Sequence, residues 1–173
     1  MRRPAVLERR ASALLAAGLL LGPTAPALAR AGTVAARFRS SPWATINACD
    51  PPGGAEQVGV RASVPNRADA AQWVRIRIEF FDRRRRSWRV VRTGGDTGFR
   101  RLSRGGGRIL GGTTFTITPP GAGRSVTLRG LVDVQWRRGL RVLSSAQVTT
   151  HGGHLDGNDP LLQVSARTCV IRR

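Results

Sequence analysis

Hydrophobic and polar residues alternate along this chain in several short stretches, with the period of two that β-strands show when one face is buried. The clearest example is WVRIRIEFF, residues 73–81, in which Val74, Ile76 and Ile78 alternate with charged residues. Comparable apolar stretches lie at residues 43–49, 57–64, 87–93, 113–120, 125–136, 140–150 and 162–171. Beyond the N-terminal segment, no window has the period of an amphipathic helix. The pattern therefore predicts an all-β fold.

Turn residues separate these stretches. The four arginines Arg83–Arg86 fit the short loop of a hairpin between residues 73–81 and residues 87–93. Residues 137–139, RRG, predict a second turn between two alternating stretches. The glycine-rich residues 94–112 predict a long surface loop.

We expect a single antiparallel β-sandwich of about seven or eight strands over residues 43–173. Short strands with one apolar face bury that face by packing two sheets against each other. Trp73, Trp136 and Trp43 are expected to supply bulk between the two sheets, because tryptophan side chains bury a large area.

The N-terminus has the pattern of a secretory signal peptide. A positively charged start precedes ASALLAAGLLL, residues 11–21, and the small residues of PTAPALA follow. Cleavage is expected after Ala29, with Ala31 as the second choice, so residues 1–29 form a helical signal peptide and residues 30–42 a basic lead-in. The alternative is a retained membrane anchor, but the apolar run is short for a bilayer span. We expect a chain without a transmembrane segment after cleavage, either secreted or associated with the cell wall.

Two cysteines, Cys49 and Cys169, remain in the exported chain. An even cysteine count in an exported chain favours a disulfide, and two free thiols are the alternative. A bridge between them would close nearly the whole domain into one loop, which the chain-entropy account converts to about 4–5 kcal/mol of stability.

The charge is extreme. The formal net charge of the full sequence is +19, and every positive side chain is an arginine. Removing residues 1–29 takes away four arginines and Glu8, so 25 arginines and nine acids remain (29 − 4 and 10 − 1). The absence of lysine indicates the codon bias of a GC-rich genome, because lysine also binds phosphate. The charge nevertheless predicts attraction to anionic polymers without sequence preference.

The densest positive charge is expected in the predicted turns. The candidate anion-binding residues are Arg83, Arg84, Arg85, Arg86, Arg137 and Arg138. Further contributors are Arg100, Arg101, Arg104 and Arg108 in the glycine-rich segment, and Arg75 and Arg77 on one sheet face. Few exposed aromatic residues are available to stack on bases, Phe81 and Trp88 at best, so we expect no specific nucleic-acid partner.

The segment HGGHLDGNDP contains four weak candidates for metal ligands, His151, His154, Asp156 and Asp159. Its His-x-x-His spacing lacks the helix that the usual zinc motif requires, and its acids lack the spacing of a calcium loop. We interpret it as a polar turn and expect no metal and no cofactor. No Gly-x-Ser-x-Gly motif or other marked nucleophile occurs, so we expect no enzymatic activity and identify no catalytic residue.

A resemblance extends over about residues 40–171. SPWATINACD, VRIRIEFFD, LRGLVDVQWRRG and SARTC resemble segments of a group of exported, uncharacterised proteins of high-GC actinobacteria. The resemblance implies an immunoglobulin-like or fibronectin-III-like β-sandwich with one cysteine in the first strand and another near the C-terminus. The chain departs from ordinary immunoglobulin domains, because it lacks their Cys–Trp–Cys spacing and the tyrosine of the tyrosine corner. The resemblance implies no particular chemistry.

Together these features favour an exported, non-enzymatic interaction or structural module, whose partner is another protein or an anionic polymer of the cell envelope. One alternative is a basic protein that binds such anionic polymers. The other is a metal-binding or hydrolytic protein that uses His151, His154 and Asp156.

Overall fold

The computed structural model describes residues 41–52, 56–102, 107–118, 120–160 and 164–173. The predicted signal peptide and all but the last two residues of the predicted lead-in lie outside these ranges. The strands are β1 (Trp43–Cys49), β2 (Gln57–Pro65), β3 (Ala71–Asp82), β4 (Ser87–Val90), β5 (Arg100–Arg101), β6 (Arg108–Thr116), β7 (Ser125–Arg138), β8 (Arg141–Thr149) and β9 (Cys169–Arg172). Within the described ranges the fold is all-β, as predicted, and contains no helix that could cross a membrane.

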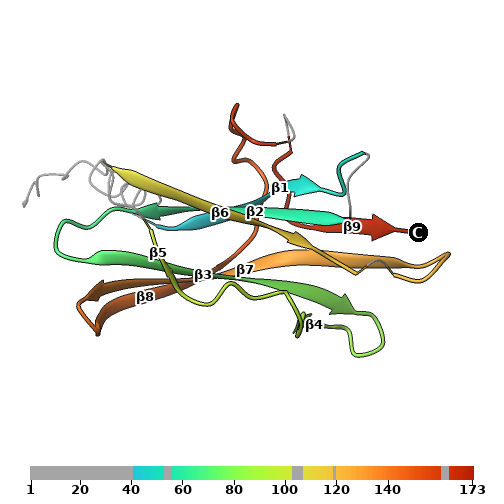
Figure 1. The fold of residues 1–173 in the computed structure, drawn as a ribbon, viewed down its shortest axis with the longest axis horizontal. Coiled ribbons are helices and arrows are strands. Elements are labelled where there is room, and N and C mark those ends of the chain that lie inside the picture. The colour runs from blue at the N-terminus through green and yellow to red at the C-terminus, as the bar shows by residue number, and fades with distance from the viewer. Residues whose placement is uncertain (1–40, 53–55, 103–106, 119, 161–163) are drawn as a thin grey trace, which may run out of the picture.

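Two antiparallel sheets form the two layers seen in Figure 1. The small sheet has the order β1-β2-β6, and the large sheet has the order β4-β3-β7-β8. Two short strands complete the large sheet, because β5 pairs with β3 and β9 pairs with β7. The predicted pair of antiparallel sheets is therefore present, and the described residues form nine strands where seven or eight were expected.

The long strands β3 and β7 form the centre of the large sheet. They pair over their whole common length, from Ala71 opposite Arg137 to Phe80 opposite Leu128. On its other edge, each of them pairs with two further strands. β4 and β5 pair with β3, and β8 and β9 pair with β7. This register places the β3–β4 turn and the β7–β8 turn at opposite ends of the sheet.

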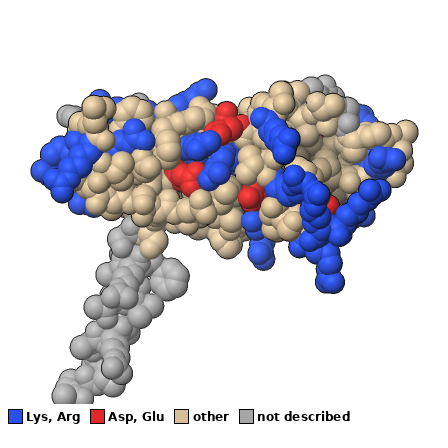
Figure 2. Space-filling model, turned by 90° about the horizontal axis from the view of Figure 1, so that it is seen from below, with Lys and Arg blue, Asp and Glu red and all other residues tan. Residues whose placement is uncertain are grey.

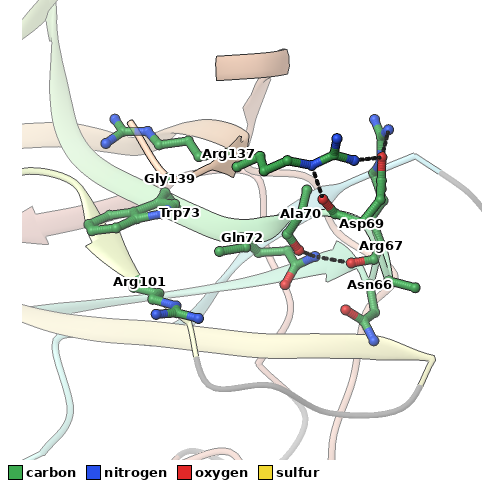
Figure 3. A pocket seen from close by; sticks show the side chains of 12 residues that line it. Asn66, Arg67, Asp69, Ala70, Gln72, Trp73, Arg101, Arg137 and Gly139 are labelled. Carbon is green, nitrogen blue, oxygen red and sulfur yellow. Dashed lines mark hydrogen bonds and ion pairs between the residues drawn. The ribbon is translucent and has the colours of Figure 1, made fainter. Parts of the chain in front are cut away.

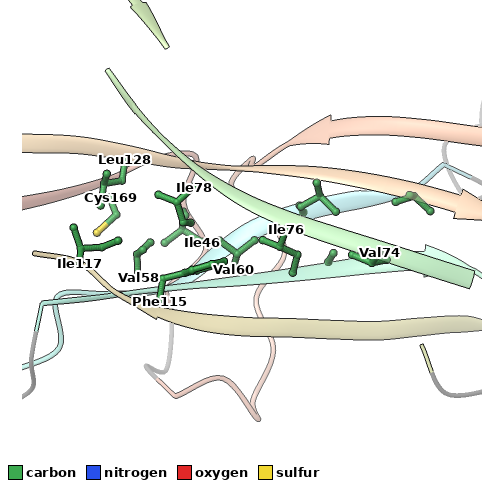
Figure 4. Packing of buried hydrophobic residues seen from close by; sticks show 14 of the residues in the cluster. Ile46, Val58, Val60, Val74, Ile76, Ile78, Phe115, Ile117, Leu128 and Cys169 are labelled. Carbon is green, nitrogen blue, oxygen red and sulfur yellow. The ribbon is translucent and has the colours of Figure 1, made fainter. Parts of the chain in front are cut away.

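One hydrophobic core fills the space between the two sheets (Figure 4). Ile76 and Ile78 of β3 and Val132 of β7 are buried there against Val60 of β2. The sheets come especially close at Gly130, where an added Cβ would lie 2.7 Å from Thr150 Cγ2 and 3.0 Å from Val60 Cγ1. The alternation read from the sequence of β3 and β7 therefore gives their buried faces correctly.

The tryptophans differ from the prediction. Trp136 is buried in the core, and its indole N–H donates a 3.1 Å hydrogen bond to the carbonyl oxygen of Pro65. Trp73 lies on the outer face of the large sheet, because it is an odd number of positions from the inward-facing Ile76. Trp43 is half-buried and stacks flat on the His154 ring, with 3.9 Å between ring centroids. Only Trp136 supplies the bulk that we expected from all three.

The glycine-rich segment was predicted wrongly as a loop throughout. It contains β5 and the first half of β6, so the stretch predicted at residues 113–120 belongs to a strand that begins at Arg108 and ends at Thr116. Position 112 requires a residue without a side chain, because an added Cβ would lie only 2.9 Å from the carbonyl oxygen of Val60. In the sequence, a glycine that permits close packing within a sheet cannot be told from a glycine of a turn.

Two further strands are shorter than predicted. The stretch at residues 87–93 ends as a strand at Val90, and the stretch at residues 162–171 becomes β9 only from Cys169. Ala166, within that second stretch, makes only an isolated antiparallel bridge to Ile46 of β1. Residues 161–163 lie outside the described ranges.

The predicted disulfide between Cys49 and Cys169 is present. Cys49 ends β1 in the small sheet, and Cys169 begins β9 at the edge of the large sheet. The bridge therefore connects the two layers covalently and closes a loop with a sequence separation of 120.

The four arginines form the predicted turn of the β3–β4 hairpin. Asp82 closes it, since its Oδ1 accepts hydrogen bonds of 3.1 Å from the backbone N–H groups of Arg84 and Arg85. These hydrogen bonds, that from Arg85 foremost, lower the pKa of the Asp82 carboxyl. Arg86 has a φ of +51°, in the left-handed region that glycine adopts without steric cost. The turn thus includes a strained arginine.

Replacing this residue by glycine is expected to stabilise the protein. Arg86→Gly should raise the free energy of unfolding by up to about 1 kcal/mol, because a non-glycine residue at positive φ costs about 1–2 kcal/mol and glycine adds back some unfolded-state entropy. Chemical denaturation measures the change. Arg84→Gly is the matched control with the same loss of charge in the same turn, and it should not stabilise. A gain of similar size in both variants would indicate relief of charge repulsion instead.

Candidate anion-binding site at one end of the sandwich

Arginines in the middle of the outer face of the large sheet are paired with acids. Arg77 on β3 contacts Asp133 on β7 at 2.5 Å, and Arg129 on β7 contacts Glu79 on β3 at 2.7 Å. Arg75 also binds a carboxylate, that of Asp96. Figure 2 shows the resulting mixture of acidic and basic surface between the two ends. Since these charges largely cancel, this part of the face does not attract anions strongly.

At each end of the sandwich two arginines share one acid, Asp69 at one end and Asp82 at the other, and both ends are rich in basic surface in Figure 2. One end has the exposed turn Arg83–Arg86, and a 3.2 Å hydrogen bond from Arg83 to Ser125 Oγ connects it to the start of β7. The other end has the β2–β3 turn, β5 and the β7–β8 hairpin. Arg137 and Arg138 lie there. The structure therefore divides the predicted anion-binding residues between opposite ends.

The second end contains a hollow of about 330 Å³, which we call the arginine pocket (Figure 3). It is lined by residues 66–73 from the β2–β3 turn and the start of β3, by Arg101 of β5, and by residues 137–139 of the β7–β8 hairpin. The hairpin can project here because its loop has only two residues, Gly139 and Leu140, with Gly139 at φ +58°.

Arg137 is positioned in the arginine pocket by uncharged groups. Its guanidinium carbon lies 4.8 Å from the ring centroid of Trp73 and 4.9 Å from that of Phe99. Its Nε donates a 2.7 Å hydrogen bond to Oε1 of Gln135. Figure 3 shows the Trp73 indole between the side chains of Arg137 and Arg101, its cross-strand neighbour on β5. Stacking fixes the guanidinium plane without neutralising its charge.

Asp69 is the single carboxylate among the residues that line the arginine pocket. It accepts two hydrogen bonds of 3.1 Å from Arg67, which lower the pKa of its carboxyl. Arg138 donates to the carbonyl oxygen of the same residue at 3.2 Å and approaches its carboxylate at 3.5 Å. Four arginines against this one acid leave a formal charge of +3 (4 − 1) in the lining.

The β2–β3 turn that presents Arg67 and Asp69 is fixed by Gln72. Its side chain is almost fully buried, and its Nε2 donates hydrogen bonds to the carbonyl oxygens of Ala70 at 2.9 Å and Arg67 at 3.3 Å. The arginine pocket therefore combines a rigid floor with charged donors at its rim. Its lining includes no serine, cysteine or histidine, and this composition suits binding of anions through arginine better than nucleophilic chemistry.

Two of the other arginines considered as contributors lie at the end that contains the arginine pocket. Arg108 on β6 is opposite Pro65, next to Asn66 of the pocket lining, and donates a 2.7 Å hydrogen bond to Ser63 Oγ. Arg100 is exposed on β5 next to the arginine pocket, and Arg104 lies outside the described residues. Sequence reasoning did not single out Arg67, Asp69 or Trp73 for this site. The sequence did offer one signal for these residues. Asn, Arg and Asp form a turn just before a strand in which Trp and Arg alternate with apolar residues.

The four weak metal candidates lie on a segment that covers the outer side of the small sheet. Arg61, buried on β2, contacts Asp156 at 2.5 Å and Asp159 at 3.1 Å and donates to the carbonyl oxygen of His154. Asn47 donates a 2.9 Å hydrogen bond to Asp159. In the described ranges, no group of three or more His, Cys, Asp and Glu side chains is placed to bind a metal ion. The two acids here instead neutralise an arginine that sequence analysis had not considered.

His154 is expected to make stability depend on pH. Burial lowers the pKa of its imidazole below the usual value of 6.5, and the charge of Arg61 adds to this effect. The folded state therefore favours neutral imidazole, so the stability it confers is complete above about pH 6.5 and is lost as the pH falls from there toward the folded pKa. His154→Phe retains a flat ring against Trp43 and should flatten the unfolding free energy between pH 7 and pH 5. His151→Gln should not; an unchanged slope in His154→Phe would refute the assignment.

Comparison with known proteins returned no matching family model, no matching curated protein and no matching solved structure. The resemblance to exported actinobacterial proteins stays a prediction.

Proposed function

We propose that this chain is an exported, non-enzymatic β-sandwich, of the immunoglobulin-like or fibronectin-III-like kind, that binds anionic polymers outside the cell through the arginine pocket. The N-terminal signal pattern and the disulfide support export, since disulfides persist in oxidising compartments. Polymers of the cell envelope that carry phosphate or carboxylate groups are the partners such a protein meets first.

The observation that carries the proposal is the contrast between the middle and the end of the large sheet. In the middle, arginines are matched with acids, as in the pair of Arg77 with Asp133. At the end, Arg67 and Arg138 share the one carboxylate of Asp69, Arg137 is fixed by aromatic rings and an amide, and among the described residues no acid pairs with Arg101. Guanidinium groups fixed in place bind phosphate and carboxylate oxygens in a fork, with less entropy lost per hydrogen bond.

Binding of inorganic polyphosphate and of polygalacturonate to the purified chain tests the proposal and separates phosphate from carboxylate recognition. The double variant Arg101→Gln/Arg138→Gln should weaken binding about tenfold at physiological salt, since two ionic contacts are lost. The slope of log affinity against log salt should fall by about 1.4–1.8 for two lost phosphate contacts, and the loss is read by titration calorimetry.

The matched control removes the same charge from the opposite end. Arg84→Gln/Arg85→Gln should change the affinity by less than about twofold if the arginine pocket is the site. Equal losses in the two double variants would show that net charge alone drives binding, and the proposed site would then be wrong. Binding that is absent at low salt would remove the proposed function altogether.

A further inference from the structure

A second, apolar pocket opens between the two sheets at the end opposite the arginine pocket. Its volume is about 470 Å³, within the range of small-molecule sites. Phe80 of β3 and Val126 and Leu128 of β7 form one wall, and Ile117, just after β6, forms part of the other. Val91, just after β4, and Pro120 complete the apolar lining. This pocket is a continuation of the hydrophobic core that side chains do not fill.

Three of these apolar side chains are only half-buried although they belong to the edge of the core. Phe80, Val91 and Val126 pack on the buried cluster and remain partly accessible. Inward-facing apolar residues at the end of a sandwich are normally covered, because exposed apolar area is unfavourable. An apolar ligand that enters between the sheets would cover them.

The polar groups at the rim of the pocket indicate that the ligand also has a polar group. Arg92 is the single ionisable residue in the lining, and it is exposed. Among the described residues no carboxylate lies within ion-pair distance of it. The remaining polar lining residues are threonines, Thr93, Thr116 and Thr118, whose hydroxyls can donate hydrogen bonds. An uncompensated arginine and hydroxyl donors above an apolar cavity complement an anionic headgroup on an aliphatic chain.

We infer that this pocket binds a single-chain aliphatic carboxylate, with the chain between Phe80, Ile117 and Val126 and the carboxylate at Arg92. The inference does not depend on the proposed polymer binding, since the two pockets lie at opposite ends of the sandwich and share no residue.

Calorimetric titration with dodecanoate below its micelle concentration tests the inference. We expect saturable binding at one site, and decanoate should bind about tenfold more weakly, because each buried methylene adds a fixed increment to the transfer free energy. Val126→Trp should fill the cavity and weaken dodecanoate binding at least tenfold. Thr118→Trp narrows the cavity from an exposed position and should act in the same direction if Val126→Trp fails to fold. No saturable binding, or full affinity in both tryptophan variants, would overturn the inference.

Dodecanol tests the role of Arg92. Arg92→Gln should weaken dodecanoate about fivefold and leave the uncharged dodecanol unchanged. Arg84→Gln removes one charge from the same end and is the matched control, which should leave both ligands unaffected. An equal loss of dodecanoate affinity in both arginine variants would show that the effect of Arg92 comes from net charge alone, and the inferred contact between Arg92 and the carboxylate would then be wrong. Arg101→Gln/Arg138→Gln should retain dodecanoate binding, so failure of polymer binding and failure of this site are separate results.

Discussion

Removing the disulfide is expected to lower the free energy of unfolding by about 4–5 kcal/mol. Cys49 and Cys169 close a loop with a sequence separation of 120, and the entropy that such a crosslink removes from the unfolded chain is of this size. Since whole domains are stable by only about 5–15 kcal/mol, Cys49→Ala/Cys169→Ala should be close to unfolding at 37 °C. Urea denaturation of the purified variant measures the loss.

The position of the bridge adds a second expectation. It connects β1 in the small sheet to β9 at the edge of the large sheet, close to the end of the chain. Without it, β9 is held by its four-residue ladder with residues 125–128 of β7 and by the buried side chain of Ile171, so its amides should exchange faster than those of the longer β3–β7 ladder. Chemical reduction of the unmutated protein is the control and should reproduce the loss. A reduced protein as stable as the oxidised one would contradict the prediction.

Replacing Arg61 by methionine should cost about 3–5 kcal/mol. The guanidinium is buried on β2 beneath residues 154–159, where it compensates Asp159, whose side chain is only 4% exposed. A buried carboxylate that loses its partner still bears the free-energy cost of desolvation but no longer gains the attraction to the opposite charge. Removing one partner of a buried ion pair is therefore more destabilising than replacing both by uncharged residues. Thermal and urea denaturation of Arg61→Met give the magnitude.

A matched set of variants separates charge from packing. Arg61→Met combined with Asp156→Asn and Asp159→Asn removes the uncompensated charges and should recover most of the loss. Arg141→Met changes an exposed arginine and should stay within about 0.5 kcal/mol of the unmutated protein. If the triple variant is no more stable than Arg61→Met, the contribution of Arg61 is packing of its side chain and not neutralisation.

The buried faces of the long strands β3 and β7 were predicted correctly, and the reason is physical. In β3 and β7 every second side chain faces the core, so the apolar alternation of Ile76, Ile78 and Val132 is a direct consequence of which face loses water. By the same rule Trp73 belongs to the outer face. The alternation therefore places it correctly, and the prediction that it lies in the core did not follow the alternation. β6 was missed in part because Gly112 lies against the backbone of Val60 and Gly111 against the side chain of Leu102, contacts that no local pattern reveals.

The candidate sites were predicted much less well. Arg137 and Arg138 were recognised as charged turn residues, but their neighbours Arg67 and Arg101 come from other turns and strands. The apolar pocket at the opposite end was not predicted at all. Its walls derive from β3, β7 and the residues after β4 and β6, and its volume depends on how far the sheets diverge. Pockets between elements depend on long-range packing, which a single sequence does not display.

The sequence by itself determined the strand class, the buried faces of β3 and β7 and both hairpin turns, and it favoured the pairing of Cys49 with Cys169. These follow from local periodicity, turn chemistry and cysteine count. Only the tertiary structure decided which arginines are neutralised and which are not. Whether a guanidinium meets a carboxylate depends on cross-strand register and on segments that return over a sheet, as Asp133 and Asp159 do for Arg77 and Arg61. The run Arg83–Arg86, the most conspicuous feature of the sequence, is a turn that Asp82 closes, while the pocket around Arg137 is the proposed site.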